Sequence, residues 1–463
     1  MEFRLSETNR GKKSLIYDGF TFRIDRTLKS GDISWRCTVK ACKGRIKTDE
    51  HSTVILNGNC DHQHESDARK LERQIIRVVV KKKSTEDITA RPMKLVRCEL
   101  MNIEEETLIE KDLKSLTMAI YRERRKEYPT LPKSRDDVHN TMDVLELKSN
   151  KKEPFCLMNS KEHGIVILSC NSNLDALCTK ASELFIDGTF SYCPKYFEQL
   201  YTFHGFKLGH YVPLVFALLP SKSEEIYTVL LNMISSLCTD RNIMFKPRIV
   251  HIDFEIAMHN AFRSVFPDTR IECCRFHLGQ SWWRKIQKLG LSVEYKNKEC
   301  EVGLWLTKFF GLAFLDPTTV GDCFAEDMYE DIPNDPRCVK FADYLVETYI
   351  APESLFPPRL WASLPSSESR RTTNGPESFH AHYNEQFYSA HPCIFVFLDT
   401  ILKLQTTTYI KLRGLDTAAV VRRSEKEKTD YLMEQFRKYQ DGEVNRLSFL
   451  KAIGFKFSAR TDM

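Results

Sequence analysis

The sequence has no long apolar run, no internal repeat and no low-complexity tract. Its longest apolar stretch, residues 211–220, is about half the length that a helix needs to cross a bilayer. The first residues, MEFRLSETNR, are polar, so no signal peptide is expected. These absences argue against membrane-spanning and secreted proteins and predict an intracellular one. Its fifteen cysteines are then expected to be buried thiols or metal ligands rather than disulfides.

Length and charge indicate several domains and a polyanionic partner. A chain of 463 residues is too long for one ordinary hydrophobic core, so two or three domains are expected. The net charge is +5, and residues 1–50 carry a net +5 by themselves, from twelve Lys and Arg against seven Asp and Glu. A basic N-terminus suits a nucleic acid, because neutralised phosphates release counterions. The alternative is a solvated basic face.

Two pairs of metal-binding side chains lie between residues 37 and 64, spaced as C-x4-C and H-x-H. A cysteine pair on a β-turn can hold one side of a tetrahedral zinc ion, and an extended strand would direct both imidazoles to the other side. The ligands predicted for Zn²⁺ are Cys37, Cys42, His62 and His64. Cys60 and His51 are the alternative ligands. We therefore expect a small module that needs zinc to fold.

The residues around these pairs resemble the FLYWCH-type zinc finger. Trp35 stands just before the first cysteine, and an apolar strand pair is expected around Tyr17 and Phe20–Phe22. Ser34 and Phe22 stand where tyrosines are usual in that family. The resemblance implies binding to double-stranded DNA, and sometimes contacts with proteins. The side chains that it implies for phosphate contacts are Arg36, Lys40, Lys43, Arg45 and Lys47.

Residues 66–150 have a helical pattern that breaks at Pro92. Two basic clusters lie in it, Lys81–Lys83 and Arg122–Lys126. They could steer the protein toward DNA or act as a nuclear import signal. Basic clusters on an ordinary helix surface are the alternative.

A second region alternates buried strands with helices, and two of the strands end in an acid. Residues 184–190 contain Asp187, and the apolar run 247–253 ends in Asp253. Between and after them we expect strands at 200–208, 210–219 and 269–274, and helices at 224–237, 255–265 and 278–289.

This β-β-β-α-β-α-β-α order, with acids on the first and fourth strands, is that of an RNase-H-like fold. The first and fourth strands are neighbours in that sheet, so Asp187 and Asp253 are expected to approach one another. Two facing carboxylates repel unless divalent cations hold them, and Mg²⁺ is the cation that prefers oxygen ligands. A third acid, Glu377, follows Asn374 and Pro376 at the expected start of a helix. By itself, such a glutamate is more often a surface residue near the helix dipole.

Residues 182–390 resemble the transposase domain of Mutator-like elements (MULE), a DDE transposase family with an RNase-H-like fold. The resemblance runs through FIDGTF, HIDFEIAMHNA, CRFHLGQ and TNGPESFH. It implies catalytic acids at Asp187, Asp253 and Glu377, holding Mg²⁺ or Mn²⁺. The family's C-x2-H motif falls on Cys274 and His277, near the implied active site.

The C-x2-H motif has several interpretations. Cys274 and His277 could order the strand end, contact DNA, form a purely structural pair or make half of a zinc site. The helix start that follows could stack on unpaired bases, although buried packing is expected for at least one tryptophan. The residues of this basic, aromatic helix start are Gln280, Trp282, Trp283, Arg284 and Lys285.

The sequence thus predicts an α/β protein with an RNase-H-like transposase core and helical insertion, preceded by a small β-rich zinc finger. The expected parts are a finger at 10–66, a helical connector at 67–150, a core at 180–290, a helical insertion at 291–370, a final core helix at 371–390 and a helical tail at 391–463. We expect metal-dependent DNA cleavage and strand transfer at transposon ends, in the nucleus.

Two other functions stay open, a domesticated DNA-binding regulator without catalysis and a zinc-finger adaptor for proteins. Double-stranded DNA is the expected partner, with a homo-oligomer if the protein is active. A membrane and a small-molecule substrate are not expected. The chain after about residue 413 is expected to be solvated and partly helical.

Overall fold

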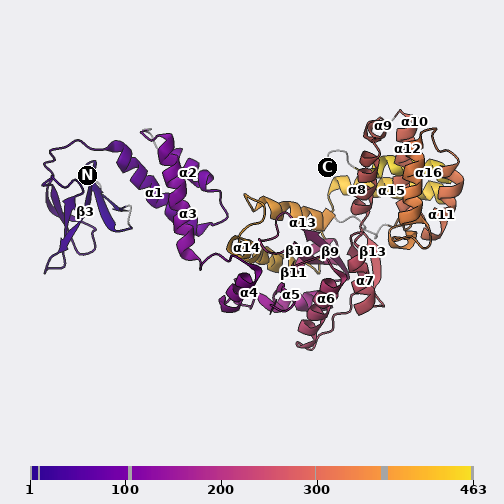
Figure 1. Ribbon diagram of the computed structural model, residues 1–463, viewed down its shortest axis with the longest axis horizontal. Coiled ribbons are helices and arrows are strands. Elements are labelled where there is room, and N and C mark those ends of the chain that lie inside the picture. Colours follow the sequence, from indigo (N-terminus) through magenta and orange to yellow (C-terminus); the bar gives the residue numbers. More distant parts are fainter. Residues whose placement is uncertain (1–2, 9–10, 103–106, 298, 367–373, 460–463) are drawn as a thin grey trace. The chain divides into compact units, whose positions relative to one another are not determined.

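The computed structural model describes residues 3–8, 11–102, 107–297, 299–366 and 374–459 (Figure 1). The chain forms two compact units, residues 1–131 and residues 132–463. The segment 67–150, expected as one connector, therefore contributes to both units. The mixed α/β class is confirmed. Within the described ranges, no helix is both long and apolar enough to span a bilayer.

The first unit begins with a six-stranded antiparallel sheet whose strands follow chain order. The strands are β1 (Arg4–Glu7), β2 (Lys13–Tyr17), β3 (Phe20–Thr27), β4 (Ile33–Cys37), β5 (Arg45–Thr48) and β6 (Ile55–Asn59). Alternate side chains of a strand point to opposite faces, and one face carries a small core. That core contains Leu15, Phe22, Trp35, Cys37, Cys42 and Ile46. A core of this size needs a further staple to be stable.

Three helices complete the first unit, and their apolar sides pack together. They are α1 (Ala68–Glu86), α2 (Pro92–Leu100) and α3 (Glu110–Glu127). Pro92 opens α2 at its first turn, where a missing backbone N–H costs nothing. The side-chain amide of Gln74 in α1 donates to the hydroxyls of Ser6 and Ser14, over 3.1 and 2.9 Å. The helices are thereby joined to the sheet.

The second unit is built on a seven-stranded sheet of order β13-β12-β9-β10-β11-β8-β7. Its strands are β7 (Cys156–Ser160), β8 (Ile165–Leu168), β9 (Glu183–Thr189), β10 (Gln199–Lys207), β11 (His210–Leu219), β12 (Ile249–Ile252) and β13 (Arg270–Cys273). The expected antiparallel meander is confirmed in β9–β11, and β12 runs parallel to both β9 and β13. The first and fourth of the expected strands are therefore neighbours. β7, β8 and α5 (Asn171–Thr179), which precede them, are additions to the expected order.

Helices pack on the two faces of this sheet. The face with Ile186 and Phe203 belongs to the main core, together with α6 (Glu224–Thr239) and α7 (Ile256–Val265). On the opposite face, α13 (Asn374–Glu385) contacts β9 and β11, and α14 (Ile394–Arg413) contacts β11 (Figure 1). Because side chains alternate along β9, Asp187 lies on this second face with Phe185.

A set of shorter helices follows α8 (Arg275–Lys288). The described regular elements of residues 291–366 are all helical: α9 (Ser292–Lys296), α10 (Glu301–Lys308), η1 (Phe309–Phe314), η2 (Pro317–Thr319), α11 (Val320–Cys323), η3 (Phe324–Tyr329), α12 (Pro336–Leu345), η4 (Val346–Ile350) and η5 (Pro358–Leu360). After α14 come α15 (Arg423–Gln440) and α16 (Arg446–Phe457).

The C-terminal stretch is not a solvated tail throughout. Its expected helices are present, but α16 packs against α10 and η1. Phe449, Leu450 and Ile453 of α16 have no exposed surface. The expectation of a solvated segment was wrong for α16, because its apolar side completes the core of the helical region.

Candidate functional site

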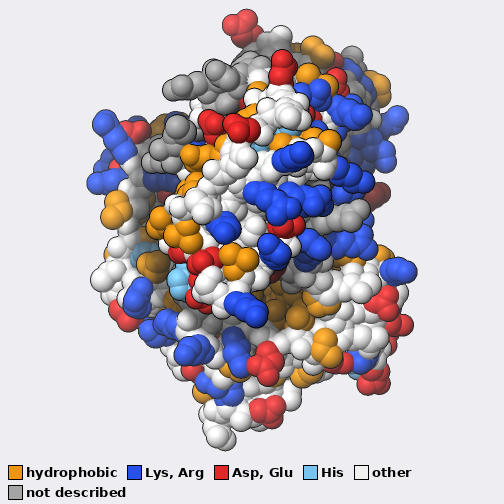
Figure 2. Space-filling model, turned by 90° about the vertical axis from the view of Figure 1, so that its left-hand side faces the viewer, with side chains coloured by type: hydrophobic (Ala, Val, Ile, Leu, Met, Phe, Trp, Pro, Cys, Tyr) orange, Lys and Arg blue, Asp and Glu red, His pale blue; other side chains and the backbone are white. Residues whose placement is uncertain are grey.

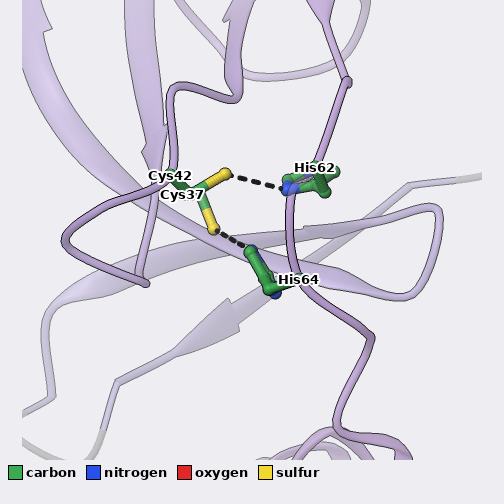
Figure 3. Close-up of side chains that lie close together, drawn as sticks. All are labelled: Cys37, Cys42, His62 and His64. Carbon is green, nitrogen blue, oxygen red and sulfur yellow. Dashed lines mark hydrogen bonds between the residues drawn. The ribbon is translucent and has the colours of Figure 1, made fainter.

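Two sulfurs and two imidazoles converge beside the first sheet (Figure 3). The Sγ atom of Cys37 lies 3.4 Å from Nε2 of His64, and Sγ of Cys42 lies 3.2 Å from Nδ1 of His62. All four ligand atoms lie within 4.8 Å of one another. Tetrahedral structural zinc takes two or more thiolates with imidazoles in such an arrangement, so the residues fit Zn²⁺.

A backbone turn brings the two cysteines together. Cys37 ends β4, and a turn in which the Cys42 N–H donates to the Val39 carbonyl returns the chain toward it. The Gly44 N–H donates to Sγ of Cys42 over 3.3 Å. Burial raises the pKa of Cys42, but the Gly44 N–H and His64 outweigh it, and the pKa is lowered overall. The thiolate, which is the form that binds metal, is thereby favoured.

The histidine pair lies in the loop between β6 and α1 rather than in the extended strand that was expected. Other contacts orient it. The ring of Phe20 stacks on His62 with 3.6 Å between centroids. Nδ1 of His64 lies 3.0 Å from the Glu65 carbonyl, so Nδ1–H donates there and Nε2 faces Cys37. This outer contact fixes the tautomer that a metal requires.

Gly44 lies directly against the imidazole of His62. A Cβ atom at this position would lie 2.7 Å from Cε1 of His62. Glycine is therefore required for the close approach of this turn to the imidazole. Cys60 and His51, the alternative ligands, are not part of the cluster found among the described residues.

The outer face of the finger sheet carries a row of arginines. In the strand register, Arg23 of β3 is directly opposite Arg36 of β4, which is directly opposite Arg45 of β5. Like charges facing one another across strands destabilise a sheet. Arg45 has an ion pair with Asp25 at 3.6 Å, and Nε of Arg36 is buried without a hydrogen bond. Blue Lys and Arg side chains also gather on the side of the molecule shown in Figure 2.

The other expected phosphate contacts lie on the same module. Lys40, Lys43 and Lys47 are all exposed. Lys47 lies on β5 two residues after Arg45, so both side chains point to the outer face. The surface that the row and Lys47 form is suited to a polyanion.

A second cluster lies where β9 and β12 run side by side. Leu184 pairs with Val250 and Phe185 with His251, and this parallel register, continued by two residues, sets Asp187 beside Asp253. Oxygen atoms of both acids and a nitrogen of His277 lie within 4.8 Å of one another. The structure thus brings the first two expected acids together.

Two imidazoles flank these carboxylates. Nδ1 of His277, in the first turn of α8, lies 2.5 Å from Oδ1 of Asp253, and Nε2 of His380, in α13, lies 3.8 Å from Oδ2 of Asp187. Both nitrogens are buried, and neither makes a hydrogen bond of acceptable geometry. His277 is thus ion-paired with Asp253, whereas Nε2 of His380 lies beside Asp187 without a hydrogen bond.

The titration of these groups follows from their burial and charge. Burial raises the pKa of Asp187, His380 lowers it, and Asp253 raises it, with a net upward shift. Burial lowers the pKa of His277, but Asp253 beside it raises it overall. The pKa of His380 is lowered, chiefly by burial. A buried acid next to a second acid is costly without a cation, and the oxygens of Asp187 and Asp253 fit Mg²⁺.

Glu377 lies at the edge of this cluster. It belongs to the first turn of α13, as expected from its motif, and Sγ of Cys274 lies 4.0 Å from its Oε1. Ligand atoms of Cys274, His277 and Glu377 lie within 4.8 Å of one another. Among the described residues, the three acids do not form a single group within that distance. His277 is the member common to both groups.

Other expectations for this region had mixed outcomes. His277 lies inside α8, which begins at Arg275 rather than at the expected residue 278. Trp282 and Trp283 are 1% and 2% exposed, so stacking on bases is wrong for both in this conformation. The expected cap by the Asn374 side chain lies outside the described residues.

His380 was not among the expected site residues. It follows Glu377 by three positions, which places both on one side of α13. That i, i+3 spacing was the available signal in the sequence.

Comparison with known families identifies the two regions. Residues 5–64 match the FLYWCH zinc finger domain, and residues 183–281 match the MULE transposase domain. Both resemblances and their order along the chain are confirmed. The second match covers Asp187, Asp253, Cys274 and His277 and ends before Glu377. No curated protein matches the chain. The domain content is that of a transposase-like DNA-binding protein.

Proposed function

We propose that this protein binds double-stranded DNA and, with Mg²⁺ or Mn²⁺, cleaves it and transfers its strands, using Asp187, Asp253 and Glu377 on an RNase-H-like core. The observation that carries the proposal is the position of Asp187 beside Asp253 on neighbouring parallel strands. Two acids on adjacent strand ends, one of them with a raised pKa, are a costly arrangement that a metal site explains.

Each residue of the cluster has a defined part in this proposal. Asp187 and Asp253 supply the metal-binding oxygens, and Glu377 supplies a third from α13. Bound cations activate the attacking oxygen and stabilise the leaving oxygen in phosphoryl transfer. His277 neutralises Asp253 in the metal-free protein and must release it when the carboxylate binds a cation. His380, whose pKa is lowered by burial, lies beside Asp187 as a neutral imidazole.

The finger supplies the DNA contacts in this proposal. Zn²⁺ held by the Cys37, Cys42, His62 and His64 cluster keeps the sheet folded, and the arginine row meets phosphates on its outer face. The same proposal assigns the protein to the nucleus. It also requires a homo-oligomer if the protein is active, since two DNA ends must be joined.

The test is strand cleavage by the full-length protein on DNA that carries the sequences flanking its gene. We expect cleavage with Mg²⁺ or Mn²⁺ and little with Ca²⁺, whose looser coordination misplaces the reacting oxygens. Asp187→Asn, Asp253→Asn and Glu377→Gln should each lower the cleavage rate by about a thousandfold or more while DNA binding persists. The control is Glu225→Gln, an exposed acid at the start of α6. Equal cleavage by wild type and Asp187→Asn would remove the active-site assignment.

A second candidate function is a DNA-binding regulator without catalysis. Glu377 faces Cys274 and His277 rather than completing one group with the two aspartates, which favours this candidate. It predicts DNA binding that depends on the finger, with no cleavage in any metal. Terminal inverted repeats flanking the gene distinguish the two candidates, because a mobile element needs them and a domesticated gene does not.

A further inference from the structure

Cys274 occupies a position that metal-dependent cleavage does not explain. It is 1% exposed and lies at the junction of β13 and α8, where its backbone N–H donates to the Ile252 carbonyl. Mg²⁺ binds oxygen and does not take thiolate ligands. Yet the sulfur is directed toward Glu377, at 4.0 Å from Oε1, and lies in one group with His277.

The three side chains form a donor set of different chemistry from the paired aspartates. One sulfur, one imidazole nitrogen and one carboxylate oxygen are ligands that Zn²⁺ accepts, with a fourth position left for water. The bond lengths of tetrahedral zinc place its ligand atoms roughly 3.3 to 3.8 Å apart. The three donors here lie within 4.8 Å of one another, so small side-chain rotations suffice to reach that spacing.

The backbone holds two of these donors in place without metal. Cys274 is the N-cap of α8 and His277 stands three residues on, so both side chains lie on one side of the helix start. The first turn of α13 brings the third donor. Nδ1 of His277 is paired with Oδ1 of Asp253 at 2.5 Å, and this pair must open if the same nitrogen binds a metal ion.

We propose that Cys274, His277 and Glu377 bind Zn²⁺, and that this zinc site excludes the magnesium site because the two share Glu377. The binding itself stands on the three donors alone, and only its effect on cleavage rests on the proposed function. A zinc ion held by Cys274 and His277 removes Glu377 from the carboxylates and blocks cleavage. Zinc would thus act as an inhibitor at the catalytic centre and as a structural ion in the finger.

The experiment measures zinc per chain in the full-length protein after removal of free metal. We expect two equivalents in wild type, one in Cys274→Ala, and two in the matched control Cys273→Ala, whose buried side chain lies outside the donor set. With Co²⁺ in place of Zn²⁺, the thiolate-to-metal absorption of the second site should be absent in Cys274→Ala and present in the control. One equivalent in wild type, or two in Cys274→Ala, would overturn the site.

A second variant and a cleavage assay test the zinc site even if Cys274→Ala does not fold. If Cys274→Ala fails to fold, Glu377→Gln makes the same test, because this side chain is only half-buried. In a cleavage assay with Mg²⁺, wild type stripped of its second zinc equivalent should cleave, and refilling that site with Zn²⁺ should lower the rate by tenfold or more. A wild type that binds two equivalents of zinc, and still cleaves no DNA with Mg²⁺ after the second equivalent has been removed, supports the zinc site and contradicts the proposed catalysis. Uninhibited cleavage at full occupancy of both zinc sites contradicts the exclusion.

Discussion

Two buried acids, one in each unit of this protein, have opposite electrostatic surroundings. In the first unit, Asp112 has no exposed side-chain surface, but Arg69 and Arg73 bind its two oxygens over 2.7 and 2.8 Å. In the second unit, Asp187 is nearly as buried, and its neighbours are another acid and two imidazoles. The pKa of Asp112 is lowered, by Arg69 first, whereas the pKa of Asp187 is raised, by burial first.

The two candidate metal clusters differ in how many ligands they provide. The finger cluster provides four donors, which complete the coordination of a structural zinc ion. The acid cluster provides three donors, two carboxylates and the imidazole of His277, and a three-donor set is usual in catalytic metal sites. A buried acid whose charge is balanced by neighbouring cations is suited to a structural role, and one beside a second acid is suited to binding and chemistry.

The largest expected effect on stability comes from the zinc ligands of the finger. Cys42→Ser should cost the finger about 10 kcal/mol or more of folding free energy, because zinc binding supplies that stability. Hydrogen exchange should then become fast across residues 11–64 and stay slow in the second unit. Zinc analysis should show one equivalent fewer than in wild type. Cys60→Ser, outside the cluster, is the control, and unchanged zinc in Cys42→Ser would remove this residue as a ligand.

The second largest effect on stability is expected from Asp112, the acid that two arginines bind. Asp112→Asn should destabilise the first unit by about 2 kcal/mol, since it leaves two arginines without their partner, although both are partly exposed to water. The lowered pKa of Asp112 stabilises the fold above the unfolded value of about 4, and this contribution is lost as pH falls through the folded pKa. Wild type should therefore lose its advantage over the variant in acid.

Thermal unfolding of the two proteins between neutral pH and about pH 3 checks this dependence. Glu110→Gln, which breaks an exposed pair with Lys114 on the same helix, is the control and should change stability little. A constant difference between wild type and Asp112→Asn across this pH range would contradict the assignment.

Replacing Asp187 should change stability in the opposite direction to replacing Asp112. Without added divalent metal, Asp187→Asn should stabilise the second unit by about 1 kcal/mol at neutral pH, because it removes a buried charge. The raised pKa of Asp187 means that the folded state binds the proton more tightly than the unfolded chain. The cost of its ionisation therefore grows as pH rises above about 4 and is constant above the folded pKa.

Mg²⁺ should make wild type more stable than Asp187→Asn. It should raise the melting temperature of wild type, which binds it, and leave that of Asp187→Asn nearly unchanged. Glu225→Gln, exposed on α6, should follow wild type in both conditions. Destabilisation by Asp187→Asn in the absence of divalent metal would show that the carboxylate has a structural partner.

The sequence predicted what depends on local pattern. The zinc ligands lie within a short segment, and the apolar runs that end in Asp187 and Asp253 have a period and length that identify strands. Their adjacency followed from strand order. The position of His380 beside Asp187 was not foreseen, because it depends on how α13 packs on the sheet.

Long-range packing also explains why the sequence did not predict β7 or the burial of α16. β7 is a short strand of half-buried residues, CLMNS, with little apolar alternation to mark it. α16 buries Phe449, Leu450 and Ile453 against helices more than a hundred positions earlier in the chain. A local pattern does not show which surface such a helix will cover.

The smallest effect concerns the arginine row on the outer face of the finger sheet. Arg23, Arg36 and Arg45 face one another across three strands, with Asp25 paired to the last of them. If the row meets DNA phosphates, Arg45→Gln should weaken binding similarly on all sequences and reduce the slope of log affinity against log salt by about 1. Lys29→Gln removes an equal charge from the exposed loop between β3 and β4 and is the control. An equal loss of slope in both variants would mean that net charge, and not the row, binds the DNA.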